Sequence, residues 1–269
     1  MRAVIGELLF DDDVALAMAT RAGAHGVYVH NAMAEHEGDG FVLTADGSVA
    51  LVWIGPRGNL VVIEGGTAVP VAMGAKVADE IVRRRKPWRI AMGPPATIDC
   101  LRERLPVAPL AFREQVYYVG DARSAVPSPR AGEVRSAQRA DRDRLMQATL
   151  ALNASDLNVD PARVDRRWLR DTIDERIANG TTRVIGAAGA FASKLDIGSD
   201  GPGGAVIEGV FTFPEHRGQG LATALVATCL SRASGAMCLH VAKHNRPARA
   251  AYAAAGMRED GSCRLLLLP

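Results

Sequence analysis

The sequence predicts an α+β protein built from two modules. Two observations carry this prediction: the order meander, helix, strand, helix, strand occurs twice, and a segment rich in Pro, Gly, Ala and Ser separates the two occurrences. That segment, GDARSAVPSPRAGE (120–133), has two X-Pro bonds, which disfavour helix, and no apolar periodicity. We therefore expect an N-terminal domain over 1–120, a linker over 121–132 and a C-terminal domain over 133–269. With 269 residues, of which 48% are apolar, each domain can bury a core.

The N-terminal half contains three apolar runs separated by the turn signals DGS and GPRGN, which predicts a strand meander. Two segments with helical spacing of apolar residues follow, and each precedes a run typical of a strand. The basic run RRRKPWR (83–89) falls at a predicted helix end, where cations oppose the helix dipole. The expected elements are strands over 40–46, 48–55 and 59–66, a helix over 71–85, a strand over 88–93, a helix over 96–105 and a strand over 113–120.

The C-terminal half repeats this order, with two helices placed after its first short strand. Gly180 supplies the stop for the second of these helices, and Pro247 suits the first turn of the last helix. The expected elements are a strand over 133–137, helices over 139–156 and 164–180, strand material over 182–198 and 203–213, a helix over 218–233, a strand over 236–242, a helix over 246–257 and a strand over 263–269.

Composition excludes several classes of protein. The formal net charge of +2, with both signs mixed along the chain, gives no reason to expect nucleic acid or an anionic membrane as a partner. The four cysteines form no CxxC pair, so we expect neither a metal site nor a disulfide framework but reduced thiols. The N-terminus places acidic residues directly behind a short apolar run, unlike a signal peptide, and no apolar run approaches the ~18 residues of a membrane span. We expect a soluble, cytoplasmic protein.

The stretch FPEHRGQGLATAL (213–225) connects an apolar strand to a helix through a turn with almost no side chains. The free N–H groups of a helix start carry the positive end of the dipole, and glycines let a bulky anion approach the main chain. The alternative is an ordinary tight turn. A dinucleotide-binding fingerprint does not fit, because the loop comes late and no acidic residue ends the next strand; a Walker loop is absent.

Two separated motifs resemble the acetyl-CoA site of GCN5-related N-acetyltransferases (GNAT). The first is R-x-x-G-x-A from Arg217 to Ala222; the second is Asn245, 25 residues after Gly220, with Tyr252 seven residues further on. The resemblance covers roughly 133–269. It implies a tandem GNAT-like fold with a mixed, mostly antiparallel sheet flanked by helices, whose fourth and fifth strands splay apart in the C-terminal module.

The N-terminal half is more faintly similar to the degenerate GNAT-like module that precedes the catalytic one in some two-module bacterial acetyltransferases. Nothing in residues 1–120 resembles the R-x-x-G-x-A loop, so we expect this half to bind no coenzyme. It could shape the acceptor pocket or form a homodimer contact, and the sequence does not separate these roles.

The resemblance also implies how acetyl-CoA is held. In the family the pantetheine arm bonds like an extra strand along the fourth strand, here Val206 to Phe213, at the gap towards Met237 to Ala242. Asn245 is expected to hold the pantetheine or to cap its helix, and these roles are compatible. The expected coenzyme-binding residues are the main chain of Val210, Phe211 and Thr212, the side chain of Arg217, the amides of Gly218, Gln219, Gly220, Leu221, Ala222 and Thr223, and Asn245.

Acetyl transfer to an amine requires a neutral nucleophile, so a base or a desolvated site must remove a proton. Glu208 is the only charged residue of its apolar strand; the alternative is an ion pair with an arginine or a contact at the strand rim. His240 lies five residues before Asn245, where several relatives carry a glutamate assigned as the base; the alternative is a satisfied core histidine. Water-relayed deprotonation would make both dispensable. His216 and His244 are expected at the surface.

Tyr252 is expected to protonate the departing thiolate, a role that the resemblance also assigns to this position. The alternative is a half-buried core tyrosine. A strand amide at the gap, that of Thr212, would stabilise the negative charge of the tetrahedral intermediate. No cysteine or serine has the neighbours that a nucleophile requires, so we expect direct transfer without a covalent enzyme intermediate.

The acceptor side is poorly defined by the sequence. Asp156 and Asp160 could meet a cationic amine, but we interpret both as helix caps, and Trp168 as a core residue. The expected acceptor is a primary amine on a small molecule or a peptide. The alternative function is a non-catalytic acyl-CoA-binding regulatory or sensor protein, in which the loop binds the coenzyme and no reaction is catalysed.

Overall fold

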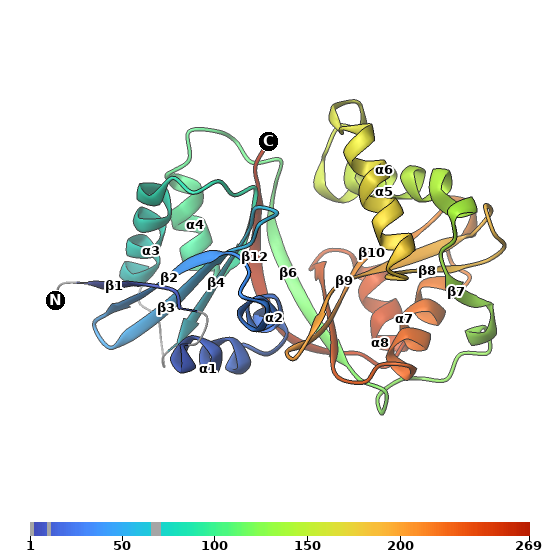
Figure 1. The fold of residues 1–269 in the computed structure, drawn as a ribbon, viewed down its shortest axis with the longest axis horizontal. Helices are drawn as coiled ribbons and strands as arrows, with labels where there is room; N and C mark the ends of the chain where they lie inside the picture. The colour runs from blue at the N-terminus through green and yellow to red at the C-terminus, as the bar shows by residue number, and fades with distance from the viewer. Residues whose placement is uncertain (1–2, 10–11, 66–70) are drawn as a thin grey trace. The chain divides into compact units, whose positions relative to one another are not determined.

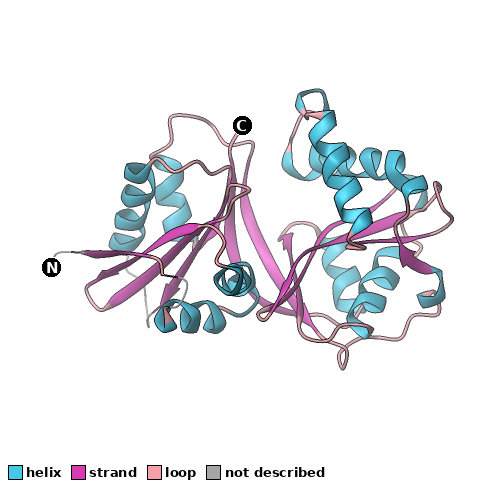
Figure 2. Cartoon of the chain, viewed as in Figure 1, coloured by secondary structure: helices cyan, strands magenta, loops and turns pink. Residues whose placement is uncertain are grey.

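The computed structural model describes residues 3–9, 12–65 and 71–269, which form two compact units (Figures 1 and 2). The N-terminal unit comprises residues up to Tyr117 together with 201–203 and 260–269. The C-terminal unit comprises 118–200 and 204–259. Each unit is a mixed sheet covered by helices, which confirms the predicted α+β class.

In the N-terminal unit the predicted meander is confirmed, and β2, β3 and β4 pair antiparallel in sequence order. Asp46 and Gly47, both with positive φ (50° and 78°), form the two-residue turn between β2 and β3 that an Asp-Gly pair favours. The elements are β1 Val4–Glu7, α1 Asp13–Arg21, α2 Val27–Glu35, β2 Asp39–Ala45, β3 Ser48–Ile54, β4 Asn59–Gly65, α3 Val71–Arg84, β5 Ile90–Gly93, α4 Pro95–Glu103 and β6 Ala111–Gly120. Gly66, expected to end the third strand, lies outside the described residues.

The last strand of the chain belongs mainly to this N-terminal unit. β12, Arg258–Leu267, pairs antiparallel with β5, and Leu265 lies opposite Met92. In the sheet β12 has β5 on one side and β6 on the other. The compact units are therefore not continuous in sequence: the final strand completes the sheet that residues near the N-terminus begin.

In the C-terminal unit, strands β7 to β11 lie in the order β11-β10-β9-β8-β7, with the end of β6 next to β11. The segment 182–198, expected as strand material, forms two antiparallel strands joined by a turn around the fully buried Phe191. The elements are β7 Val134–Ser136, α5 Arg142–Leu157, α6 Arg166–Ala178, β8 Thr182–Ile185, β9 Ser193–Gly201, β10 Gly204–Thr212, α7 Leu221–Ser231, β11 Met237–Ala242 and α8 Arg246–Ala254.

The helices of the C-terminal unit cover both faces of its sheet: α5 and α6 lie on one face, α7 and α8 on the other (Figure 1). The first face has an aromatic core, in which Phe211 and Phe213 meet edge to face with ring centroids 5.2 Å apart. The guanidinium of Arg144 from α5 lies 3.8 Å from the centroid of the Phe213 ring. On the other face α7 is almost wholly buried, which fixes where its N-terminus emerges.

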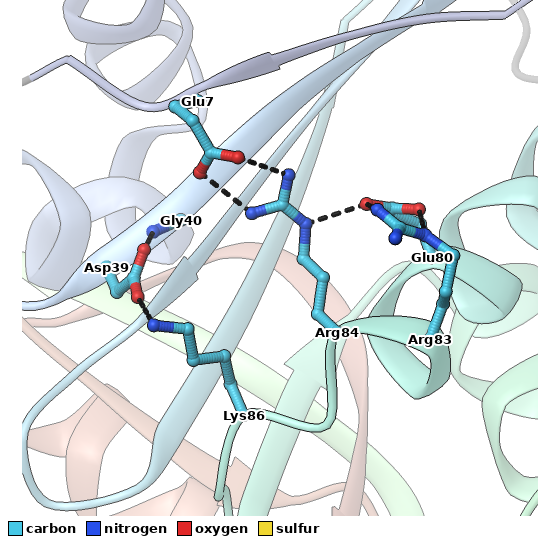
Figure 3. A network of polar contacts seen from close by, with 7 residues as sticks. All are labelled: Glu7, Asp39, Gly40, Glu80, Arg83, Arg84 and Lys86. Carbon is cyan, nitrogen blue, oxygen red and sulfur yellow. Dashed lines mark hydrogen bonds and ion pairs between the residues drawn. The ribbon is translucent and has the colours of Figure 1, made fainter.

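A charged network closes the C-terminal end of α3 in the N-terminal unit (Figure 3). Arg84 donates two hydrogen bonds to Glu7 of β1, each 2.8 Å long, and one of 2.7 Å to the buried Glu80 of its own helix. Its guanidinium also lies 4.6 Å from the centroid of the Phe41 ring. Arg83 donates to Glu80, and the helix ends at Arg84. The predicted helix end in the basic run is confirmed, with carboxylates as the partners of its cations.

Candidate coenzyme and catalytic site

The loop between β10 and α7 presents bare main chain. Gly218 and Gly220 have φ of +75° and +72°, conformations that glycine adopts without strain, and a Cβ at either position would meet nothing within 4 Å. Among the described residues no side chain caps α7, whose first intrahelical bond runs from the Ala224 amide to the Gly220 carbonyl at 2.9 Å. The amides from Leu221 to Thr223 precede that bond and have no intrahelical acceptor. The loop thus offers N–H donors at the positive end of a helix dipole.

Two arginines hold the loop. Arg217 Nε donates to the Thr212 carbonyl at 3.2 Å, and Arg130 Nη1 donates to the Gln219 carbonyl at 3.4 Å. Sequence reasoning missed Arg130, which lies in the expected linker; the only local signal was its positive charge. Arg217 adds positive charge next to the exposed glycines, whereas Arg130 also pairs with Glu133, with Nε 2.9 Å from Oε1.

Main-chain groups at the end of β10 point alternately towards β9 and towards the side of β11. Ser193 Oγ of β9 donates to the Phe211 carbonyl at 2.8 Å, and the Phe213 amide donates to the Ala192 carbonyl at 3.1 Å. Because main-chain groups alternate sides along a strand, Phe211 faces β9, whereas Val210 and Thr212 face the side of β11. Of the three residues predicted to hold the pantetheine arm, these two have the required direction.

The parallel register between β10 and β11 involves the start of both strands. Ala205 lies opposite Met237 and Val206 opposite Cys238. Further along β10, Gly209 has φ +57°, and a Cβ there would lie 2.7 Å from Asp196 Oδ2 and 2.8 Å from Lys194 Nζ. A left-handed glycine inside a strand is typical of a bulge, which bends the strand and increases its twist. The bend precedes the segment predicted to hold the arm.

Asn245 and Tyr252 lie on α8. Asn245 caps the helix, with Oδ1 accepting from the Ala248 amide at 3.2 Å. Thr223 Oγ1 in the first turn of α7 donates to the Ala251 carbonyl at 3.3 Å, so the loop helix is bonded to α8 one residue before Tyr252. The capping role predicted for Asn245 is confirmed, and its contact with pantetheine stays a prediction.

Tyr252 is 6% exposed and packs edge to face on Tyr118, with ring centroids 5.9 Å apart. Burial, and secondarily the negative charge of Asp156, raise the pKa of Tyr252. A phenol with a raised pKa stays protonated at neutral pH, as a proton donor must. The structure therefore gives Tyr252 both the burial of a core residue and the protonation state of a general acid.

The two base candidates have different surroundings. Glu208 on β10 is 31% exposed at its side chain and forms an ion pair with Arg176 of α6, with Oε2 3.4 Å from Nη2. This is the arginine pair that the sequence left open as the alternative to catalysis. His240 lies half-buried on β11. The catalytic role of either residue stays a prediction.

A buried ion cluster borders Glu208 on the face that α6 covers. Lys194, 2% exposed, places Nζ 2.5 Å from Asp196 Oδ2, and Arg176 Nη1 lies 2.7 Å from the same oxygen. Thr182 Oγ1 donates to the other oxygen of Asp196 at 2.6 Å. Burial opposes ionisation, but Lys194 and Arg176 hold the pKa of Asp196 below its usual range. Sequence reasoning missed this cluster; the signal was a pair of opposite charges two residues apart, next to Leu195 and Ile197.

Three acceptor-side expectations have different outcomes. Asp160 accepts from the Ala162 amide at 2.9 Å, so its capping role is confirmed. Asp156 lies in the last turn of α5, where it cannot cap a helix start, so that interpretation was wrong. Trp168 is 61% exposed, so its assignment to the core was also wrong. It lies in the first turn of α6, and the buried contacts of that helix begin at Leu169.

The described residues contain neither a cluster of metal ligands nor a membrane-spanning helix. Across 3–9, 12–65 and 71–269, no group of three or more His, Cys, Asp or Glu side chains is arranged to hold a metal ion. The four cysteines are free thiols. None of the helices in the described ranges is long and apolar enough to cross a membrane.

Comparison with known proteins identifies relatives. The family model "Acetyltransferase (GNAT) family" matches residues 147–257, and no curated protein sequence matches the chain. A solved Drosophila protein has a TM-score of 0.64 at 12% identity, with 100% of this chain and 99% of that chain covered. A GCN5-related N-acetyltransferase from Sphaerobacter thermophilus has a TM-score of 0.56 at 15% identity, covering 98% and 94%. A GNAT-family acetyltransferase from Colwellia psychrerythraea has 0.53 at 12%, covering 98% of each chain.

Because the identities are this low, the solved structures are evidence for the fold alone. They share that fold with this chain over nearly its full length. The family match lies within the half of the chain that contains the glycine loop and α8. Residues 147–257 thus match the GNAT family model, and the chain shares the fold of solved GNAT-family proteins over nearly its full length.

Proposed function

We propose that this protein is an acetyl-CoA-dependent N-acetyltransferase that transfers the acetyl group directly to a primary amine. The observation that carries the proposal is the bond from Thr223 to the Ala251 carbonyl, 3.3 Å long. It ties the bare amides of the loop to the helix of the buried, protonated Tyr252. One connected pair of helices thus supplies an anion cradle and a proton donor.

Different residues bind the coenzyme, stabilise the oxyanion and donate the proton. The amides from Gly218 to Thr223, with Arg217, hold the pyrophosphate, because N–H donors at a helix start favour negative charge. The main chain of Val210 and Thr212 holds the pantetheine arm at the gap to β11, which the short parallel register at Ala205 and Val206 supports. The Thr212 amide stabilises the oxyanion, and Tyr252 donates a proton to the departing sulfur.

The acceptor is an amine of a small molecule or a peptide that reaches the sheet face covered by α5 and α6. Asp156 and Glu208 place carboxylates on α5 and β10. Carboxylates attract a cationic amine before it loses its proton. The chain works on soluble substrates in the cytoplasm and needs no metal.

The test is thiol release from acetyl-CoA by the purified full chain against a panel of primary amines, with acetylated product identified by mass spectrometry. Wild type is compared with Tyr252→Phe, which keeps the ring and removes the proton donor. We expect turnover on at least one amine, lowered about 100-fold in the variant. Coenzyme binding without turnover on any amine contradicts catalysis and favours a regulatory acyl-CoA sensor.

A further inference from the structure

The register of β10 and β11 relates the two base candidates. Val206 lies opposite Cys238 in a parallel pairing, and two residues further along each strand come Glu208 and His240. Residues at equal offsets from a paired position point to the same face of a sheet, because side chains alternate with period two. The bulge at Gly209 follows Glu208, so the alternation holds up to the carboxylate. Glu208 and His240 thus leave adjacent strands on the same face.

Contacts of Glu208 identify that face. A Cβ at Gly198 of β9 would lie 2.1 Å from the Glu208 carboxyl carbon, so the carboxylate occupies the space that this glycine leaves. Arg176 from α6 binds Glu208 with one Nη and Asp196 with the other. Lys194, which pairs with Asp196, adds a further charged group on the face covered by α6.

We infer that Glu208 and His240 act as one unit, in which the His240 imidazole accepts the proton of the acceptor amine and Glu208 positions it. The inference rests on the proposed function for its reaction. A carboxylate already bonded to the Arg176 guanidinium is poorly placed to take a proton, whereas an imidazole titrates near neutral pH. A carboxylate beside an imidazole fixes the tautomer and favours the imidazolium that forms. Glu208 is thus a positioning residue and His240 the catalytic base.

The proton balance of the reaction is complete with these groups. His240 takes the proton of the ammonium form, and the neutral amine forms a C–N bond to the acetyl carbon. The C–S bond breaks, and its electron pair goes to sulfur, which receives a proton from Tyr252. The second proton, which the nitrogen loses as the amide forms, returns to the tyrosinate through solvent, and after product release the imidazolium loses its proton to solvent.

A titration that needs no substrate tests the pair. The imidazole resonances of His240 are assigned by comparison with His240→Gln and followed by NMR against pH in wild type and Glu208→Gln. We expect the pKa of His240 to fall by about one unit in Glu208→Gln, because the imidazolium loses its counter-charge. Glu215→Gln removes an exposed carboxylate, 58% exposed at its side chain, and is expected to change nothing. An unchanged pKa in Glu208→Gln overturns the pairing.

Kinetic measurements test the roles of Glu208 and His240, with the amine that the panel identifies as the substrate. His240→Gln lowers kcat about 100-fold, and Glu208→Gln lowers it less and moves the acid limb of the pH profile to lower pH. The double variant is no slower than His240→Gln, because positioning has no effect once the base is gone. Additive losses, or a larger loss in Glu208→Gln, overturn the assignment. His244→Gln, an exposed histidine, is the control with unchanged kcat.

The two proposals fail separately. If wild type acetylates no amine, the enzymatic function fails while the NMR titration still decides whether Glu208 and His240 are coupled. If turnover is found with an unchanged His240 pKa in Glu208→Gln, the pairing fails and the transferase stands.

Discussion

His25 Nε2 donates a hydrogen bond to the main-chain carbonyl of Val62 at 2.7 Å in the N-terminal unit. Val62 follows directly after Val61, which lies opposite Met92 in the parallel pairing of β4 and β5. Tyr117 Oη lies 2.7 Å from the second ring nitrogen of His25, Nδ1, and donates to it, since a carbonyl can only accept from Nε2. The His25 side chain thus occupies the main-chain carbonyl just beyond the parallel pairing of β4 and β5. In the C-terminal unit, the corresponding position beyond the parallel pairing of β10 and β11 is where the pantetheine arm is proposed to bind.

We predict one coenzyme site per chain from this contact. An arm laid along β4 would have to displace His25 from Val62 and break its bond to Tyr117. Calorimetric titration of the full chain with coenzyme A should give a stoichiometry of one. Two sites of comparable affinity would show that the N-terminal unit also binds.

The glycine loop predicts a local loss of affinity on substitution. Gly220→Ala places a methyl group in the open space beside the α7 amides and strains the backbone by about 1–2 kcal/mol. The matched control is Gly180→Ala, because Gly180 has φ +64° and equally open surroundings but lies after α6. We expect similar thermal destabilisation in both variants and at least a tenfold loss of coenzyme affinity only in Gly220→Ala. Equal affinities in both variants would exclude the loop as the cradle.

Tyr252 predicts a pH dependence of stability. Its folded pKa is raised above the unfolded value of about 10, so its contribution is fully present below that pH. Above about pH 10 the unfolded chain loses the phenol proton while the folded chain keeps it, which favours unfolding. Urea midpoints of wild type should therefore fall relative to Tyr252→Phe as the pH rises above this value. Parallel curves for the two proteins would mean that the phenol is not buried.

The buried Asp196 predicts how the free energy of unfolding changes at acid pH. Asp196→Asn leaves Lys194 and Arg176 without their shared carboxylate and should lower the free energy of unfolding by about 3–5 kcal/mol at pH 7. The contribution of Asp196 is present above its unfolded pKa, near about 4, and is lost as pH falls through its lower folded pKa. Denaturant titrations between pH 2 and 7 measure this.

The control for Asp196 is Asp79→Asn. Asp79 also pairs with an arginine, Arg104, but is 67% exposed at its side chain. Exposed pairs contribute about 0–1 kcal/mol, so this variant should be almost neutral. Equal effects of the two substitutions would contradict the burial of the Lys194 cluster.

Much of the fold and the site could be predicted, because the deciding signals are local. The Asp46-Gly47 turn, the left-handed Gly220 before α7 and the Asn245 cap each depend on residues within one turn of the chain. Asp12 is an equally local signal. Its side chain caps α1 by accepting from the Val14 amide at 2.8 Å, and it would have predicted that helix.

The rest depends on partners distant in sequence. The apolar run that forms β12 predicts a strand but not its neighbour, and it pairs with β5 from the first half of the chain. Lys194 resembles a solvated lysine until Arg176 and Asp196 are brought beside it. For Trp168, periodicity predicts a helix without showing that its first turn extends beyond the core.

A crystal structure of the full chain with acetyl-CoA tests in one experiment where the coenzyme binds and where the Tyr252 hydroxyl points. We expect density for the pyrophosphate against the amides from Gly218 to Thr223, with the thioester sulfur within hydrogen-bonding reach of Tyr252 Oη. A coenzyme bound away from this loop, or a Tyr252 hydroxyl directed away from the sulfur, would contradict it.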